Sequence, residues 1–180
     1  MPTGTPVTDG TAANGLSLLV DNLPALGEAP VTVDEVNPIV RGILLVQYGM
    51  SRPDASTLAL IHAFGHVLSA AGPHQGTTHA VVAPHVLRYV FEGTGGPRPI
   101  LPAALGVGGA DDESEAVVRA VADVRDAMGL PSRLRDLDGI ERDDRPKLAA
   151  AVLEDDLAEN VPPELDPDVA DMEAILEAAW

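Results

Sequence analysis

Apolar residues recur at helical spacing through most of this chain, and capping signals mark where the helices begin and end. Leu16, Leu19 and Leu23 fall on one helical face, and Asn37-Pro38 is a typical helix start. No alternation of apolar and polar residues is long enough to predict a strand, because stretches such as residues 31–33 are too short. The sequence therefore predicts an all-α fold. Helices are expected at about residues 8–23, 39–50, 54–70, 75–91, 116–128, 145–157 and 167–179.

Several of these helices carry specific start or break signals. Asp112 and Glu115 have the spacing of a capping box. Asp166 precedes Pro167, and proline suits the first position of a helix, so we expect Asp166 to cap the last helix. Pro84 lies inside an otherwise helical segment and predicts a kink or a restart there.

The length of the chain favours one domain. A chain of 180 residues can bury a core without disulfides or metals, so we expect a single helical domain over residues 1–180. Its expected parts are a flexible N-terminus (1–8), a loop rich in Gly and Pro (92–111) and an acidic helical part (112–180). Because the N-terminal portion is the apolar one, we expect an exposed apolar patch near residues 62–85.

The charge is strongly negative and excludes one class of partner. The formal net charge is −17, Lys147 is the only lysine, and residues 111–180 hold 21 of the 28 acids. Phosphate neutralisation needs clustered Lys and Arg, so we expect no nucleic-acid partner. The acidity either serves a basic partner or keeps the protein soluble at high salt, and the shortage of lysine favours this halophilic interpretation.

The cysteine content and the apolar runs of the sequence limit where in the cell the protein is expected. No cysteine is present, which excludes disulfides and thiolate metal sites. The apolar runs are too short to span a bilayer, and the first ten residues lack the pattern of a secretory signal. We therefore expect a cytoplasmic protein with no membrane partner.

All five histidines fall within one window of 24 residues, which makes this window the candidate site. They are His62, His66, His74, His79 and His85. Histidines four apart on a helix lie on one face, and histidine clusters favour metal or proton chemistry. The alternative is that these histidines are buried, neutral and structural, and His85 fits that alternative best.

Common catalytic and nucleotide-binding motifs are absent. No H-E-x-x-H, G-x-S-x-G or P-loop pattern occurs. The glycines at 106, 108 and 109 follow a Pro-rich segment instead of a strand, and Asp111 stands where a dinucleotide-binding loop needs its third glycine. The chain itself therefore shows no apparatus for binding a nucleotide.

The histidine window resembles the iron-containing (group III) alcohol dehydrogenases, and among them the maleylacetate reductases. The matching residues are His62-Ala63-Phe64-Gly65-His66, Pro73-His74, Thr78-His79-Ala80-Val81-Val82, Pro84-His85-Val86-Leu87, Gly129-Leu130-Pro131-Ser132-Arg133-Leu134 and the closing helix from Asp168 to Trp180. The order of these motifs covers most of the chain.

This resemblance implies a fold, a reaction class and roles for individual residues. The fold is a helical bundle like the C-terminal domain of the dehydroquinate synthase-like and iron-containing alcohol dehydrogenase enzymes, in which a separate α/β domain binds NAD(P). By resemblance, His62 and His74 are metal ligands and His79 binds substrate. His66 is the catalytic residue beside the reacting carbonyl and nicotinamide, either as a proton-relay group or as a group that supports the metal ligands. The implied cofactors are a divalent metal, Fe or Zn, and NAD(P) held by the other domain.

The sequence departs from the family pattern in its metal ligands. The family also uses an Asp-x-x-x-His pair, yet no Asp before His62 is followed four residues later by His. The loop from His66 to His74 is also slightly shorter than is usual in the family. We therefore expect weak metal binding and an isolated chain that is inactive.

Three hypotheses for the function remain open. The chain is one half of an NAD(P)-dependent oxidoreductase, with a separately encoded nucleotide-binding domain as its partner. Alternatively, it is a non-catalytic helical interaction module descended from that family, or a metal- or ligand-binding domain whose likeness is structural only. Binding to the nucleotide domain or self-association would cover its apolar face.

Overall fold

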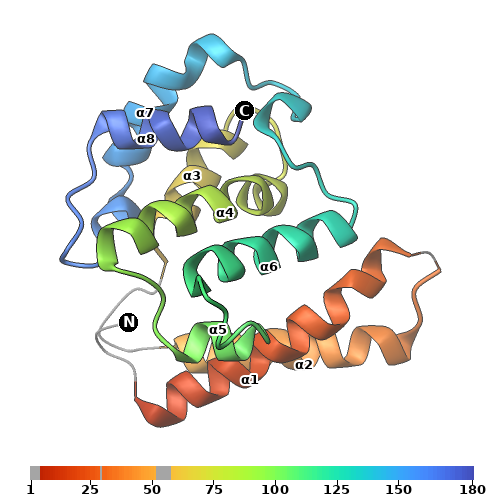
Figure 1. The fold of residues 1–180 in the computed structure, drawn as a ribbon. Coiled ribbons are helices and arrows are strands. Elements are labelled where there is room, and N and C mark those ends of the chain that lie inside the picture. The colour runs from red at the N-terminus through yellow and green to blue at the C-terminus, as the bar shows by residue number, and fades with distance from the viewer. Residues whose placement is uncertain (1–4, 29, 52–57) are drawn as a thin grey trace. The chain divides into compact units, whose positions relative to one another are not determined.

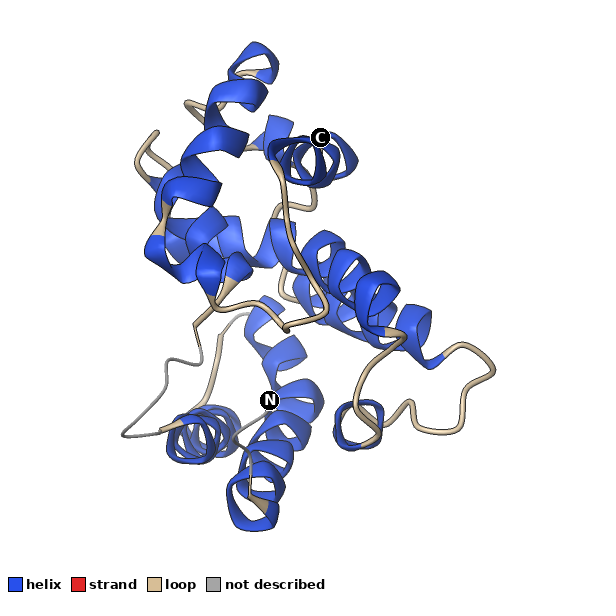
Figure 2. Cartoon of the chain, turned by 90° about the vertical axis from the view of Figure 1, so that its left-hand side faces the viewer, coloured by secondary structure: helices blue, strands red, loops and turns tan. Residues whose placement is uncertain are grey.

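The computed structural model of the chain describes residues 5–28, 30–51 and 58–180. Among these residues there are helices and connecting loops but no strand, as the periodicity predicts (Figure 2). The α-helices are α1 (Pro6–Asn22), α2 (Val33–Met50), α3 (Leu60–Ser69), α4 (Gln75–Thr94), α5 (Ile100–Ala104), α6 (Glu113–Ala127), α7 (Arg145–Glu154) and α8 (Val169–Ala178) (Figure 1). Short 3-10 helices are η1 (Leu23–Gly27), η2 (Leu134–Asp136), η3 (Arg142–Asp144) and η4 (Asp156–Glu159).

The chain divides into two compact units. The first unit consists of residues 1–57 and 96–129, and the second of residues 58–95 and 130–180. The histidine window therefore belongs to the second unit. Whether the whole chain behaves as the single domain expected from its length stays a prediction.

Helices α1 and α2 of the first unit pack closely because glycines face the contact. A Cβ on Gly15 would lie 2.7 Å from the carbonyl oxygen of Gly42, and a Cβ on Gly49 would lie 2.6 Å from that of Thr8. These pairings run in opposite directions along the two helices, so the helices are antiparallel.

Thr32 begins α2 through a capping box with Glu35. The Thr32 hydroxyl and amide donate to the Glu35 carboxylate and hold its pKa below the ordinary value.

One face of α2 is apolar and exposed. Val33 is 82% exposed, Leu44 63% and Tyr48 66%. The exposed α2 face comprises Val33, Val36, Val40, Ile43, Leu44 and Tyr48. No large apolar side chain in residues 62–85 is exposed to this degree, so the patch expected near the histidines is instead on α2. The reason is that the apolar residues of that window form the core of the second unit.

The second unit has one apolar core, to which α3, α4, α7 and α8 contribute. Phe64, Val81, Val152 and Leu176 are among its fully buried members. The amide of Leu134 donates to the carbonyl of Ala179 at 2.8 Å, which joins the segment after residue 129 to the end of α8. This core holds the helices that carry the histidines in a fixed arrangement.

The ends of several helices differ from the expectations. The last helix begins at Val169 with Asp168 as its cap, because Asp168 and Asp171 form a reciprocal capping box that Asp166 does not have. Helix α4 continues past Pro84 without a restart. Helix α5 lies inside the expected loop 92–111. Asp112 caps α6, as predicted.

Two of the expected segments extend into residues that the structure does not describe. Helix α1 begins at Pro6, inside the expected flexible segment 1–8, while residues 1–4 lie outside the described residues. The start of the helix expected at 54–70 also falls outside them, and α3 begins at Leu60. No helix in the described parts of the chain is long and apolar enough to cross a membrane.

Candidate functional site

Helix α3 places two histidines one turn apart on the side opposite its most buried residues. Ala63, Phe64 and Leu68 are buried and belong to the core of the second unit. His62 is half-buried, whereas the side chain of His66 is 47% exposed. The four-residue spacing on α3 places both on one face, as the sequence predicts. Their different exposure comes from the tertiary fold and is not part of that prediction.

Helix α4 brings a third histidine to this pair. The rings of His62 and His79 meet edge to face with centroids 4.7 Å apart. His79 lies over Gly65, where a Cβ would come closer than 3.0 Å to the His79 ring. Glycine at position 65 therefore makes room for the ring. His62, His66 and His79 are called the histidine cluster below.

The surroundings keep two members of the cluster neutral at ordinary pH. Burial lowers the pKa of His62, and the charge of His66 lowers it further. Burial also lowers the pKa of His79, with added repulsion from His62 and His66. Neutral imidazole is the form that binds a metal or accepts a proton. The Nε2 atom of His79 is buried and makes no hydrogen bond among the described residues.

His66 has a carboxylate partner that comes from a distant part of the chain. Its Nδ1 lies 3.0 Å from Oδ2 of Asp155, whose side chain is 18% exposed. Burial raises the pKa of Asp155, but hydrogen bonds from the Leu157 amide and from His66 outweigh it and leave the pKa lowered. Sequence reasoning missed Asp155, because nothing distinguishes it from the other acids of the acidic part.

His74 serves a different local purpose in the structure. It is the N-cap of α4, and its Nδ1 accepts a hydrogen bond from the Gly76 amide at 3.2 Å. It also lines a cavity of about 390 Å³ together with Thr77, Asp136 and Asp138. None of the histidine cluster lines this cavity. The two histidines expected to be metal ligands, His62 and His74, thus have separate surroundings.

The donors on this chain do not by themselves make a metal site. No three His, Asp or Glu side chains in the described parts of the chain are grouped so that they could hold one ion. Two imidazoles are fewer than the three or four protein ligands that zinc sites use. A metal bound at these histidines would therefore need ligands from outside this chain.

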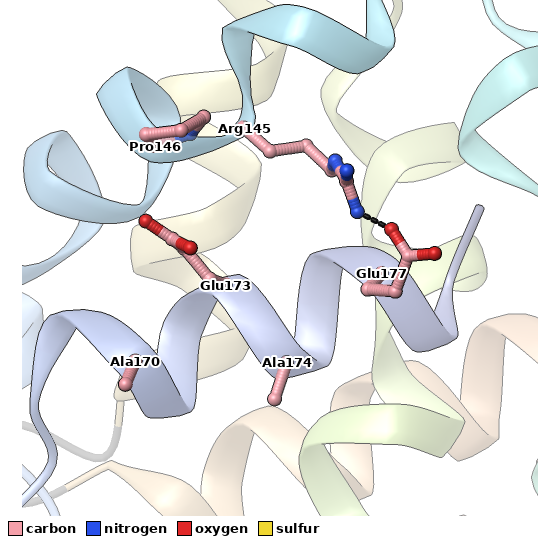
Figure 3. Close-up of a pocket in the computed structure, with 6 residues that line it drawn as sticks. All are labelled: Arg145, Pro146, Ala170, Glu173, Ala174 and Glu177. Carbon is pink, nitrogen blue, oxygen red and sulfur yellow. Dashed lines mark ion pairs between the residues drawn. The ribbon is translucent and has the colours of Figure 1, made fainter.

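A second cavity in this unit lies between α7 and α8 and has a volume of about 400 Å³. Figure 3 shows Arg145 reaching toward Glu177 across it. Glu177 forms ion pairs with Arg145 and with Arg142, the latter at 2.6 Å. Two arginines thus share one carboxylate, and such pairs near the surface contribute little to stability. We therefore interpret this cavity as a gap at the packing interface of α7 and α8 and not as a reaction site.

Comparison with known proteins places the chain in a family. All of it, residues 1–180, matches the model of the Fe-containing alcohol dehydrogenase family, C-terminal. It is 35% identical to lactaldehyde reductase of Escherichia coli over 104 residues, which are 54% of this chain and 27% of that protein. It is 30% identical to 1,3-propanediol dehydrogenase of Citrobacter freundii over 158 residues, 83% of this chain and 39% of that protein.

Solved structures show the same fold. A crystal structure of 1,3-propanediol oxidoreductase matches 98% of this chain with a TM-score of 0.81 at 24% identity. The maleylacetate reductase of Agrobacterium tumefaciens also matches 98% of it, with a TM-score of 0.75 at 23% identity. In both cases the match covers 46% of the other chain, so this chain spans less than half the length of these relatives. The chain therefore belongs to the Fe-containing alcohol dehydrogenase family and corresponds to its C-terminal part.

Proposed function

We propose that this chain is the helical half of an NAD(P)-dependent oxidoreductase that interconverts a small alcohol with its aldehyde or keto acid. The histidine cluster is the observation that carries the proposal, because it combines neutral imidazoles with a solvent-exposed one. The names of the relatives, lactaldehyde reductase and 1,3-propanediol dehydrogenase, support a small oxygenated substrate. We also propose a cytoplasmic location.

Within this function we assign a role to each histidine. His62 and His74 supply two of the ligands of a divalent ion, Fe or Zn, whose remaining ligands come from outside this chain. His66 exchanges a proton with the substrate oxygen, and His79 contacts the substrate. If bound there, such an ion would supply polarisation of the substrate oxygen, and a nicotinamide held outside this chain would supply the hydride chemistry.

The partner is the nucleotide-binding part of the enzyme, whether it belongs to the same polypeptide or to another. More than half of the length of the solved relatives lies outside this chain, and this chain lacks a phosphate-binding loop. We propose that this part covers the exposed α2 face. Contiguous exposed apolar side chains usually mark an interaction site, and the described residues do not cover this face of α2.

Charge substitutions on α2 test this partner. Leu44→Glu and Tyr48→Glu should leave the folding of the chain nearly unchanged, because both side chains are exposed, yet they should abolish binding to the N-terminal part of lactaldehyde reductase. Val7→Glu is the matched control, since Val7 on α1 is 69% exposed but lies on another helix. Equal binding by all variants, or a self-associated chain that Leu44→Glu dissociates, would contradict the assignment.

The histidine roles are tested in the combined enzyme. We expect His62→Ala and His74→Ala each to remove the bound metal, as measured by elemental analysis, and to abolish turnover. His85→Gln changes a histidine of the same window without a proposed role and should keep both the metal and the activity. Retention of metal by the His62 and His74 variants would overturn the ligand assignment.

The alternative is a non-catalytic helical module that binds a partner through α2. This alternative is favoured because the described residues contain no group of three His, Asp or Glu side chains that could hold a metal ion. A chain that binds the nucleotide-binding part tightly without any turnover would support it.

A further inference from the structure

The strongest feature outside the expected ligand set is the contact between His66 and Asp155. The two residues are 89 positions apart in the sequence, and their side chains meet at 3.0 Å between Nδ1 and Oδ2. Asp155 is mostly covered, whereas nearly half of the His66 side chain is open to solvent. One side of the imidazole ring is thus engaged by the protein while the ring remains accessible.

The position of Asp155 is fixed from two directions. Its Oδ1 accepts a hydrogen bond from the Leu157 amide at 2.9 Å and so caps η4. At the other end of η4, the side-chain amide of Asn160 donates to the carbonyl of Leu58 at 3.1 Å, just before α3 begins. These contacts hold η4 against the start of α3, so the carboxylate does not depend on His66 alone for its place.

The chemistry of the pair determines which nitrogen of His66 carries the proton. An ionised carboxylate only accepts hydrogen bonds, so Nδ1 must be the donor. In the neutral ring Nε2 then has no hydrogen and presents its lone pair. We infer that Asp155 is a positioning residue that holds His66 as the Nδ1–H tautomer, with Nε2 directed away from the carboxylate as the proton-accepting atom.

This arrangement gives His66 what a proton-exchanging group needs. The ring is held in one orientation, and Nε2 can take a proton from an alcohol oxygen, after which both ring nitrogens carry hydrogen and Asp155 faces an imidazolium. The placement of the carboxylate beside Nδ1 resembles that of the aspartate in Ser-His-Asp triads, which orients the histidine ring. The use of this proton in a reaction rests on the function proposed above, whereas the tautomer is a property of this chain alone.

The test is ¹⁵N NMR of histidine-labelled chain, without metal, cofactor or substrate. At about pH 8.5, two units above the ordinary histidine pKa of about 6.5, the rings are neutral and nitrogen shifts separate the tautomers. We expect His66 to be mainly Nδ1–H in the unmodified chain. Asp155→Asn should shift it mainly to Nε2–H, the form that histidine prefers in water.

The variants are chosen so that the fold is preserved. Asparagine caps helices about as well as aspartate, so Asp155→Asn should retain the contact to Leu157. Asp156→Asn removes the same charge from the exposed neighbouring residue and should leave the His66 tautomer unchanged. Nε2–H predominance in the unmodified chain, or an unchanged tautomer in Asp155→Asn, would overturn the inference.

Activity separates this inference from the proposed function. In the combined enzyme, Asp155→Asn should lower kcat on the order of 10- to 100-fold with little change in KM, since the residue orients His66 without binding substrate. If no combined enzyme turns over any substrate, the proposed function fails, and the tautomer measured on the chain still decides the role of Asp155.

Discussion

Whether Gly65→Ala stabilises or destabilises the fold depends on one contact, that between position 65 and the ring of His79. A Cβ at position 65 would come closer than 3.0 Å to the ring of His79, which packs between Gly65 and His62. Forcing extra volume into a packed site destabilises a fold by about 1–3 kcal/mol. Replacing glycine by alanine inside a helix stabilises it by about 0.5–1 kcal/mol. The net expectation is a loss of about 1 kcal/mol, or about 2–4 °C in Tm for a chain of this size.

The same substitution should have the opposite effect when the ring is absent. In a His79→Ala background, Gly65→Ala keeps only its helical benefit and should stabilise the chain by about 0.5–1 kcal/mol. Urea unfolding followed by far-UV circular dichroism measures all four chains of this double-mutant cycle. We expect a coupling energy of about 1–3 kcal/mol between the two positions, equal to the strain that the ring imposes.

Gly10→Ala is the control for this cycle. Gly10 lies within α1, and nothing lies within 4 Å of a Cβ built there. It should therefore stabilise the chain by about 0.5–1 kcal/mol with or without the His79 ring. If Gly65→Ala changed stability equally in both backgrounds, the ring would not occupy the space over Gly65, and the geometry of the histidine cluster would be wrong.

Two further predictions concern pH and salt. The pKa values of His62 and His79 lie below 6.5 in the folded chain, so the unfolded chain binds more protons near and below that pH. Their contribution to stability is complete above about pH 6.5 and is lost as the pH falls, so urea midpoints should decline from pH 7.5 to 5.5, and less so in a His62→Gln, His79→Gln variant. Because the net charge is −17, Tm should rise between about 0.1 M and about 2 M KCl as repulsion is screened. A flat salt dependence would favour a dedicated basic partner instead.

The fold class was predictable because its signals are local. Helical periodicity and caps such as Asp112 depend on residues a few positions apart, and the structure confirms them. The wrongly predicted helix boundaries arise where two local signals lie close together in the sequence. Asp166 before Pro167 looked like a helix start, but Asp168 has an acidic residue three positions later that completes a reciprocal box. The short helix α5 was missed because prolines and glycines surround it.

The candidate site was predictable only in part. The spacing of His62 and His66 places them on one face, which needs nothing beyond helix geometry. The meeting of His62 with His79 depends on how α3 and α4 pack, and the pairing of His66 with Asp155 on a contact across 89 residues. Such contacts follow from the tertiary fold and leave no pattern in a single sequence.

The measurement that tests the central claim most directly is turnover by the chain with and without its missing part. Purified alone and supplied with metal, NAD(P)H and lactaldehyde, the 180-residue chain should show no reaction, because nothing in it holds the nucleotide. Combined with the N-terminal part of lactaldehyde reductase, it should oxidise NAD(P)H at a measurable rate that His62→Ala abolishes. Turnover by the chain alone at an ordinary dehydrogenase rate would contradict the claim that it is one half of an enzyme.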